Sequence, residues 1–208
     1  MTRRQKVFPD PEGSISFTVD AMCRSEIEAA IDALVINENL VAAHVLASAA
    51  HDVMRGHAKR IGADLRADML SILKPLVPGR EKAFIDTMLK PYNAMKHSNA
   101  SDVAVTVHPS LTEAILFCAT QEFGSLFKYL SGKMVLFVAW YTAVEPSLRD
   151  RAGNKPEFLL EAFPSAAKAG SREEKRADLR ALLLQHMIDP SPLRDYRDTH
   201  STDGLWNT

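Results

Sequence analysis

Three polar residues with complementary chemistry lie close together near the middle of the chain. Asn93, Lys96 and His97 are spaced so that on a helix they share one side. An amide, an ammonium and an imidazole together supply hydrogen-bond donors, a positive charge and a proton-transfer group that titrates near neutral pH. This combination suits an anion such as phosphate. The alternative is that Lys96 and His97 only offset the negative end of a helix dipole.

A second polar stripe is expected on an earlier helix. His44, Ser48, His51 and Arg55 follow i, i+4, i+7 and i+11. We expect a solvated or dimer-facing surface, in which His44 and His51 approach His97 if the two helices are neighbours. Two metal ligands on adjacent helical turns are four residues apart, whereas His44 and His51 are seven apart, so we expect no metal and no cofactor.

Helical periodicity dominates the pattern of apolar residues. The expected helices cover 24–37, 39–61, a short segment from an Asp64 cap to Pro75, about 84–98, 111–131, 134–144 and a last helix that begins at Ser171. In the second helix the expected core stripe is Ala42, Leu46, Ala49 and Val53, and Gly62 is expected to end the helix. The small residues at 42, 43, 47, 49 and 50 would allow a neighbouring helix to approach closely. Two Ser-x-x-Glu patterns, Ser110 to Glu113 and Ser171 to Glu174, are typical of capping boxes that begin helices. The helix after Ser110 has two apolar stripes, so we expect it to be buried on more than one side and to end at Gly132. Pro91 predicts a kink or a restart just before the polar residues.

Short alternating stretches at about 14–19 and 103–107 suggest two β-strands that accompany the helices. The expected fold is therefore a mainly all-α, up-and-down helical bundle. We expect one helical domain over residues 1–188, with its core at about 24–145 and a helical extension at 156–188. Residues 189–208 form a polar tail.

Composition is that of an ordinary globular protein, with 208 residues, 46% hydrophobic residues and a net charge of −1. The basic N-terminus is not followed by an apolar signal-peptide segment, and the longest apolar run, 134–144, is about half the length that spans a bilayer. We therefore expect a cytoplasmic protein. Between residues 51 and 100 there are nine Lys or Arg against five Asp or Glu, a surplus of four. This surplus marks either a phosphate-facing surface or, more simply, a mixed solvated one.

The segment Asn93-Ala94-Met95-Lys96-His97 resembles the motif of HEPN domains, which are compact helical bundles that often act as metal-independent RNases. That motif has an Arg, often followed by Asn, with a His five positions after the Arg. Residues about 28–145 also resemble a group of bacterial proteins without an established activity. The likeness to this group includes the segments 43–47 and 111–113.

The resemblance implies a homodimer that binds RNA or a nucleotide. Tyr92 stands at the position of the motif's Arg, and a tyrosine lacks the bidentate fork that arginine offers to phosphate. We therefore expect ligand binding without efficient catalysis. The candidate ligand-binding residues are Asn93, Tyr92, His44, His51 and Arg55. The alternatives are a divergent RNase with His97 as acid/base and Lys96 beside the phosphate, and an interaction protein with His97 as a core hydrogen-bonding residue.

Overall fold

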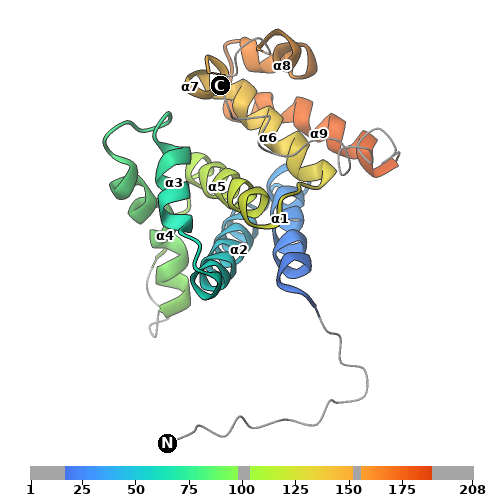
Figure 1. The fold of residues 1–208 in the computed structure, drawn as a ribbon. Helices are drawn as coiled ribbons and strands as arrows, with labels where there is room; N and C mark the ends of the chain where they lie inside the picture. The colour runs from blue at the N-terminus through green and yellow to red at the C-terminus, as the bar shows by residue number, and fades with distance from the viewer. Residues whose placement is uncertain (1–16, 98–103, 152–155, 189–208) are drawn as a thin grey trace, which may run out of the picture.

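The computed structural model describes residues 17–97, 104–151 and 156–188, and in these ranges the chain is an all-α helical bundle, as the sequence predicts (Figure 1). The helices are α1 (Val19–Val35), α2 (Leu40–Ile61), α3 (Leu65–Leu73), α4 (Glu81–His97), α5 (Pro109–Phe127), α6 (Gly132–Val144), α7 (Pro146–Arg149), α8 (Pro156–Ala162), the 3-10 helix η1 (Pro164–Ala167) and α9 (Arg172–Ile188). None of the helices within these ranges combines the length and the apolar character needed to cross a bilayer.

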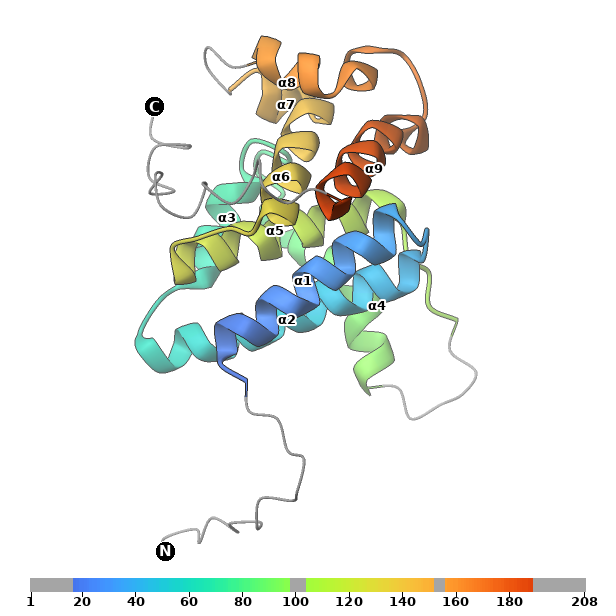
Figure 2. The same cartoon turned by 90° about the vertical axis from the view of Figure 1, so that its right-hand side faces the viewer.

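The hairpin of α1 and α2 packs against α5 at the centre of the molecule. Helices α3 and α4 lie beside α2 and α5, whereas α7 and α8 lie above the central helices in both views (Figures 1 and 2). The middle of α5, residues 112–120, is buried without interruption. This confirms the expectation that this helix is covered on more than one side.

The helix ends of the first half follow from local chemistry. Thr18 caps α1, Asn39 caps α2 and Asp64 caps α3, each through a side-chain oxygen that accepts from a backbone N–H two or three residues later. Gly62 ends α2 with a φ of +77°, a left-handed conformation that glycine adopts without strain. The predicted cap at Asp64 and the predicted terminator at Gly62 are both confirmed.

The two expected strands are absent from the part of the chain that the structure describes. Residues 14–16 and 103 lie outside the described residues, Thr18 is the cap of α1, and residues 104–107 are in no regular element. The alternation of apolar and polar residues around Thr18 reflects the entry into a helix. A strand is stable only when another strand accepts its backbone hydrogen bonds, and none of the described segments offers one.

The predicted capping box at Ser110 is wrong. His108 is the cap residue of α5, with its Nδ1 accepting from the backbone N–H of Ser110, and Pro109 is the first helical residue. The side chain of Glu113 turns into the protein interior instead of back toward the cap. The helix ends at Phe127 with Lys128 in a left-handed conformation, and Gly132, predicted as its terminator, begins α6.

The second capping box is confirmed. The backbone N–H of Ser171 donates to Oε2 of Glu174 at 2.6 Å, and the backbone N–H of Glu174 donates to Oγ of Ser171 at 3.2 Å. Pro91 lies inside α4, which is helical on both sides of it. The helix that carries the candidate site therefore passes through the proline without a restart.

Candidate functional site

The predicted site residues of α4 lie on its last two turns. Asn93, Lys96 and His97 are exposed and Tyr92 is half-buried. Because His97 is exposed and forms no hydrogen bond within the described residues, the predicted alternative of a core hydrogen-bonding role for it is wrong. The segment is a polar surface of one helix end.

A carboxylate from α2 connects two cations at this surface. Nζ of Lys96 lies 2.5 Å from Oδ2 of Asp52, and Nη2 of Arg55 lies 3.5 Å from Oδ1 of the same carboxylate. We call Asp52, Arg55 and Lys96 the Asp52 cluster. The Lys96 ammonium also lies 5.6 Å from the centroid of the Tyr92 ring. The structure therefore brings Lys96 together with Arg55 through Asp52 and with Tyr92 on its own helix.

The charges of the Asp52 cluster are set by its own contacts. Partial burial raises the pKa of Asp52, but the hydrogen bond and the positive charge of Lys96, with the charge of Arg55, outweigh it, so that the pKa lies below its usual value. The hydrogen bond to Asp52 raises the pKa of Lys96 above its usual value. All three groups are therefore charged at neutral pH. The side chains of Arg55 and Lys96 are 63% and 46% exposed, which leaves donors of both cations open to solvent.

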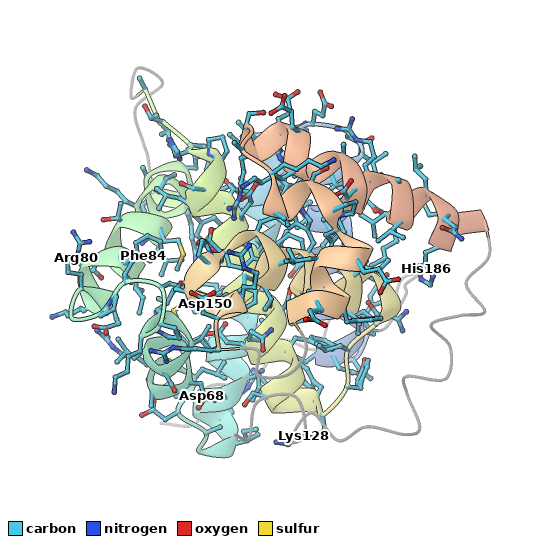
Figure 3. All side chains as sticks on the ribbon, turned by 90° about the horizontal axis from the view of Figure 1, so that it is seen from above. Asp68, Arg80, Phe84, Lys128, Asp150 and His186 are labelled. Atoms are coloured by element: carbon cyan, nitrogen blue, oxygen red, sulfur yellow. The ribbon has the colours of Figure 1, made fainter. Side chains whose placement is uncertain are left out.

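The basic residues between 51 and 100 lie on the surface of α2, α3, α4 and the segments that join them. All nine lysines and arginines in this segment are exposed. Three of the five carboxylates in this segment accept hydrogen bonds from uncharged groups. Asp64 accepts from the backbone N–H groups that it caps, Glu81 from the N–H of Gly79, and Asp68 from the hydroxyl of Ser125. Figure 3 shows Arg80 at the outer edge of the molecule. The positive charges of this region face solvent, while most of its carboxylates already accept hydrogen bonds from other groups of the protein.

The polar stripe of α2 is buried, and the expectation of a solvated or dimer-facing surface is wrong for three of its four residues. His44 and Ser48 are inaccessible to solvent and His51 is 5% exposed. Nδ1 of His44 lies 3.2 Å from Oγ1 of Thr112, and Nδ1 of His51 lies 2.7 Å from Oε2 of Glu122. The later residue of α2, His51, meets the later residue of α5, Glu122, so α2 and α5 run in the same direction along this contact. His44 and His51 thus face α5 instead of the surface that carries His97.

The face of α2 that we expected to be the core is only half-buried. Ala42, Leu46, Ala49 and Val53 keep part of their surface exposed, whereas the small residues Ala43, Ala47 and Ala50 are fully buried. Contacts with α1 on one side and α5 on another turn the small and polar residues inward. The small residues allow the close approach of helices that the sequence suggests.

Burial shifts pKa values and leaves hydrogen bonds unmade in the polar stripe of α2. Burial lowers the pKa of His44, and burial raises the pKa of Glu122, against the opposing effect of its hydrogen bond with His51. Nε2 of His44, Oγ of Ser48 and Oε1 of Glu122 are buried without a hydrogen-bond partner among the described residues. This stripe stabilises the α2–α5 contact at a desolvation cost and is not part of the open surface.

A second ion cluster, formed around the buried side chain of Glu113, lies where α5, α6 and α9 meet. Nε of Arg172 donates to Oε2 of Glu113 at 2.6 Å, its Nη2 lies 2.7 Å from Oε1 of Glu145, and Nε of Arg176 lies 3.6 Å from Oε1 of Glu113. We call Glu113, Glu145, Arg172 and Arg176 the Arg172 cluster. The guanidinium carbon of Arg172 also lies 5.4 Å from the centroids of the Trp140 and Tyr141 rings. One helical turn beyond Arg176, Nε of Arg180 donates to the carbonyl of Val35, and its guanidinium pairs with Glu38.

The acidic residues that pair with these cations and with His51, namely Asp52, Glu113 and Glu122, are not among the site residues predicted from the sequence. Asp52 lies three residues before Arg55, a spacing that favours an ion pair on a helix. Glu113 and Glu122 lie within one of the most apolar segments of the chain, and a carboxylate in such a segment is a signal of a buried, paired charge. Neither signal identifies the partner, because the partners are 44 to 71 residues away.

No protein-family model matches the chain, and it has no match among curated proteins or among solved structures. The resemblance to HEPN domains stays a prediction from the motif. The function is therefore argued from the geometry of the Asp52 cluster and its surroundings.

Proposed function

We propose that the protein binds a phosphate-bearing ligand, a nucleotide or RNA, at the surface formed by Asn93, Lys96 and His97 of α4 and Arg55 of α2. The observation that carries the proposal is that Arg55 and Lys96, from two different helices, meet at one carboxylate while their side chains stay 63% and 46% exposed. Cations that converge from two elements bind an anion better than isolated surface charges, since their positions are already fixed.

The chemistry of each residue fits this role. The guanidinium of Arg55 supplies the planar set of donors that Tyr92 cannot, and Lys96 supplies a point charge. The exposed amide of Asn93 donates to oxygen atoms of the ligand, and the half-buried ring of Tyr92 offers an aromatic face at the edge of the surface. The exposed basic residues of α2, α3 and α4 favour the approach of an anion to this part of the molecule.

The surface favours binding over efficient catalysis. A general base is normally oriented by a second group that holds its ring. His97 has no such partner among the described residues, while the histidine that does have an orienting carboxylate, His51, is buried against α5. A HEPN-like relationship and a homodimer belong to the same proposal, and light scattering after size-exclusion chromatography measures the second of these directly.

Titration of the purified protein with AMP and with a short labelled RNA tests the proposal. We expect Arg55→Ala and Lys96→Ala each to weaken binding several-fold and the pair to abolish it. The variant Arg66→Ala/Lys74→Ala removes the same charge from two exposed positions, one in α3 and one directly after it, and should retain binding. Binding that is absent from the wild type, or that is unchanged by Asn93→Ala and His97→Ala, would contradict the proposal. Incubation with total RNA covers the enzymatic alternative, since cleavage by the wild type that His97→Ala lacks would identify an RNase.

A further inference from the structure

The carboxylate of Asp52 contacts the same two cations that a ligand's phosphate would contact. Each of its two oxygens faces a different cation, Oδ2 facing Lys96 at 2.5 Å and Oδ1 facing Arg55 at 3.5 Å. Asp52 lies on the same helix as Arg55, three residues before it, and its side chain is only 28% exposed. The carboxylate is therefore held beside the two cations. An anion that contacts both cations therefore comes close to a fixed negative charge.

We infer that Asp52 is a specificity-determining residue that disfavours doubly charged phosphomonoesters relative to singly charged phosphodiesters at this surface. The inference rests on the proposed function, and it concerns which phosphate the surface selects. A lysine ammonium has three donors and an arginine guanidinium has five, so both cations keep donors for a ligand while they are paired with Asp52. The ligand therefore binds beside the carboxylate instead of replacing it.

The selectivity follows from charge. The repulsion between Asp52 and the ligand grows in proportion to the ligand's charge, so that a phosphomonoester, which carries about two negative charges above its second pKa, is penalised twice as much in free energy as a phosphodiester. Two cations and one carboxylate leave a net charge of +1, which a singly charged diester neutralises. The low pKa of Asp52 keeps this carboxylate ionised over the whole neutral range.

The other charged groups near the carboxylate leave this balance unchanged. His51, the preceding residue in α2, is paired with the buried Glu122 on the side of α5. Asp86 is an exposed carboxylate ten residues before Lys96 on α4, about 15 Å away along the helix axis. At this distance its effect is largely screened at moderate salt, which makes it a suitable control position.

Two nucleotides that share base and sugar test the inference. AMP carries a phosphomonoester and cyclic 3′,5′-AMP carries a phosphodiester, and both are titrated at pH 8 and about 0.1 M ionic strength into the wild type, Asp52→Asn, Asp52→Ser and Asp86→Asn. We expect Asp52→Asn to raise the affinity for cyclic AMP about fourfold and for AMP about sixteenfold, from Coulomb's law at about 5 Å in water. The ratio of the two affinities therefore shifts about fourfold toward AMP, and Asp52→Ser shifts it in the same direction. Asp86→Asn should leave the ratio unchanged.

The outcomes separate the inference from the proposed function. An unchanged ratio in Asp52→Asn and Asp52→Ser, with clear binding by the wild type, overturns the inference and leaves the proposed function in place. Weaker binding of both nucleotides by both Asp52 variants, with unchanged melting temperatures, also overturns it, because Asp52 would then hold the cations for the ligand. Failure of the wild type and of both Asp52 variants to bind either nucleotide overturns the proposed function, and the inference with it.

Discussion

The Asp52 cluster and the Arg172 cluster contain the same kinds of groups in two different environments. In the Asp52 cluster the side chains are 28% to 63% exposed, whereas Glu113 of the Arg172 cluster is inaccessible and its partner Arg172 is 26% exposed. Ion pairs at a surface contribute little to stability and exchange partners easily. Removal of one partner from a buried pair leaves a charge without compensation. The comparison indicates that the first cluster keeps its cations open to solvent and that the second holds α9 on the bundle.

The largest expected effect is at the Arg172 cluster. We expect Arg172→Met to lower the free energy of unfolding by about 3 kcal/mol, because Glu113 then keeps only Arg176 as a partner, at 3.6 Å. Urea unfolding followed by circular dichroism measures the change. Arg24→Met is the matched control, since Arg24 pairs with Glu28 one turn away at a partly exposed position, and it should cost less than about 0.5 kcal/mol. Equal effects of the two substitutions would remove the distinction between the clusters.

A smaller effect is expected at His44, where a buried polar group titrates. Burial lowers the pKa of His44 in the folded protein, so below the unfolded value of 6.5 the unfolded chain binds more protons than the folded one. This contribution to stability is therefore present above pH 6.5 and is lost as the pH falls toward the folded pKa. We expect a loss of about 1 kcal/mol between pH 7 and 5.5 in the wild type that His44→Asn lacks. Parallel pH profiles of the two proteins in urea unfolding would show that His44 does not carry the effect.

The smallest effect on stability is expected at the Asp52 cluster itself. Lys96→Met should leave the melting temperature unchanged within error, because the exposed ammonium gains as much from water as from Asp52. Differential scanning fluorimetry provides the measurement. A clear drop in melting temperature would assign Lys96 to the fold and would weaken the contrast with Arg172.

The sequence predicts where the helices lie better than it predicts which faces they bury. Local signals at Gly62, Asp64 and Ser171 identify helix ends correctly, because a cap involves residues within a few positions of one another. The Ser110 pattern fails because His108 and Pro109 form a competing local start and Glu113 has a distant partner. Local patterns cannot weigh such a partner.

The candidate site shows the same division. The spacing of Asn93, Lys96 and His97 correctly places them at one exposed helix end. The polar character of the α2 histidines predicts a surface position, because polar residues usually lie at the surface. Their burial depends on Thr112 and Glu122, which approach only when α5 packs on α2. The Asp52 cluster likewise exists only because α4 lies beside α2.

The four-residue spacing of Arg172, Arg176 and Arg180 has a consequence for the dynamics of the C-terminal helix. These three side chains tie successive turns of α9 to α5, α6 and the end of α1. Fraying of α9 from its first turn would leave the buried carboxylate of Glu113 without its arginine partners. The free energy of a partial opening of α9 is therefore almost as high as that of a complete one. In hydrogen exchange, α9 should therefore behave as part of the same cooperative unit as α5, with amides that exchange through global unfolding instead of local release.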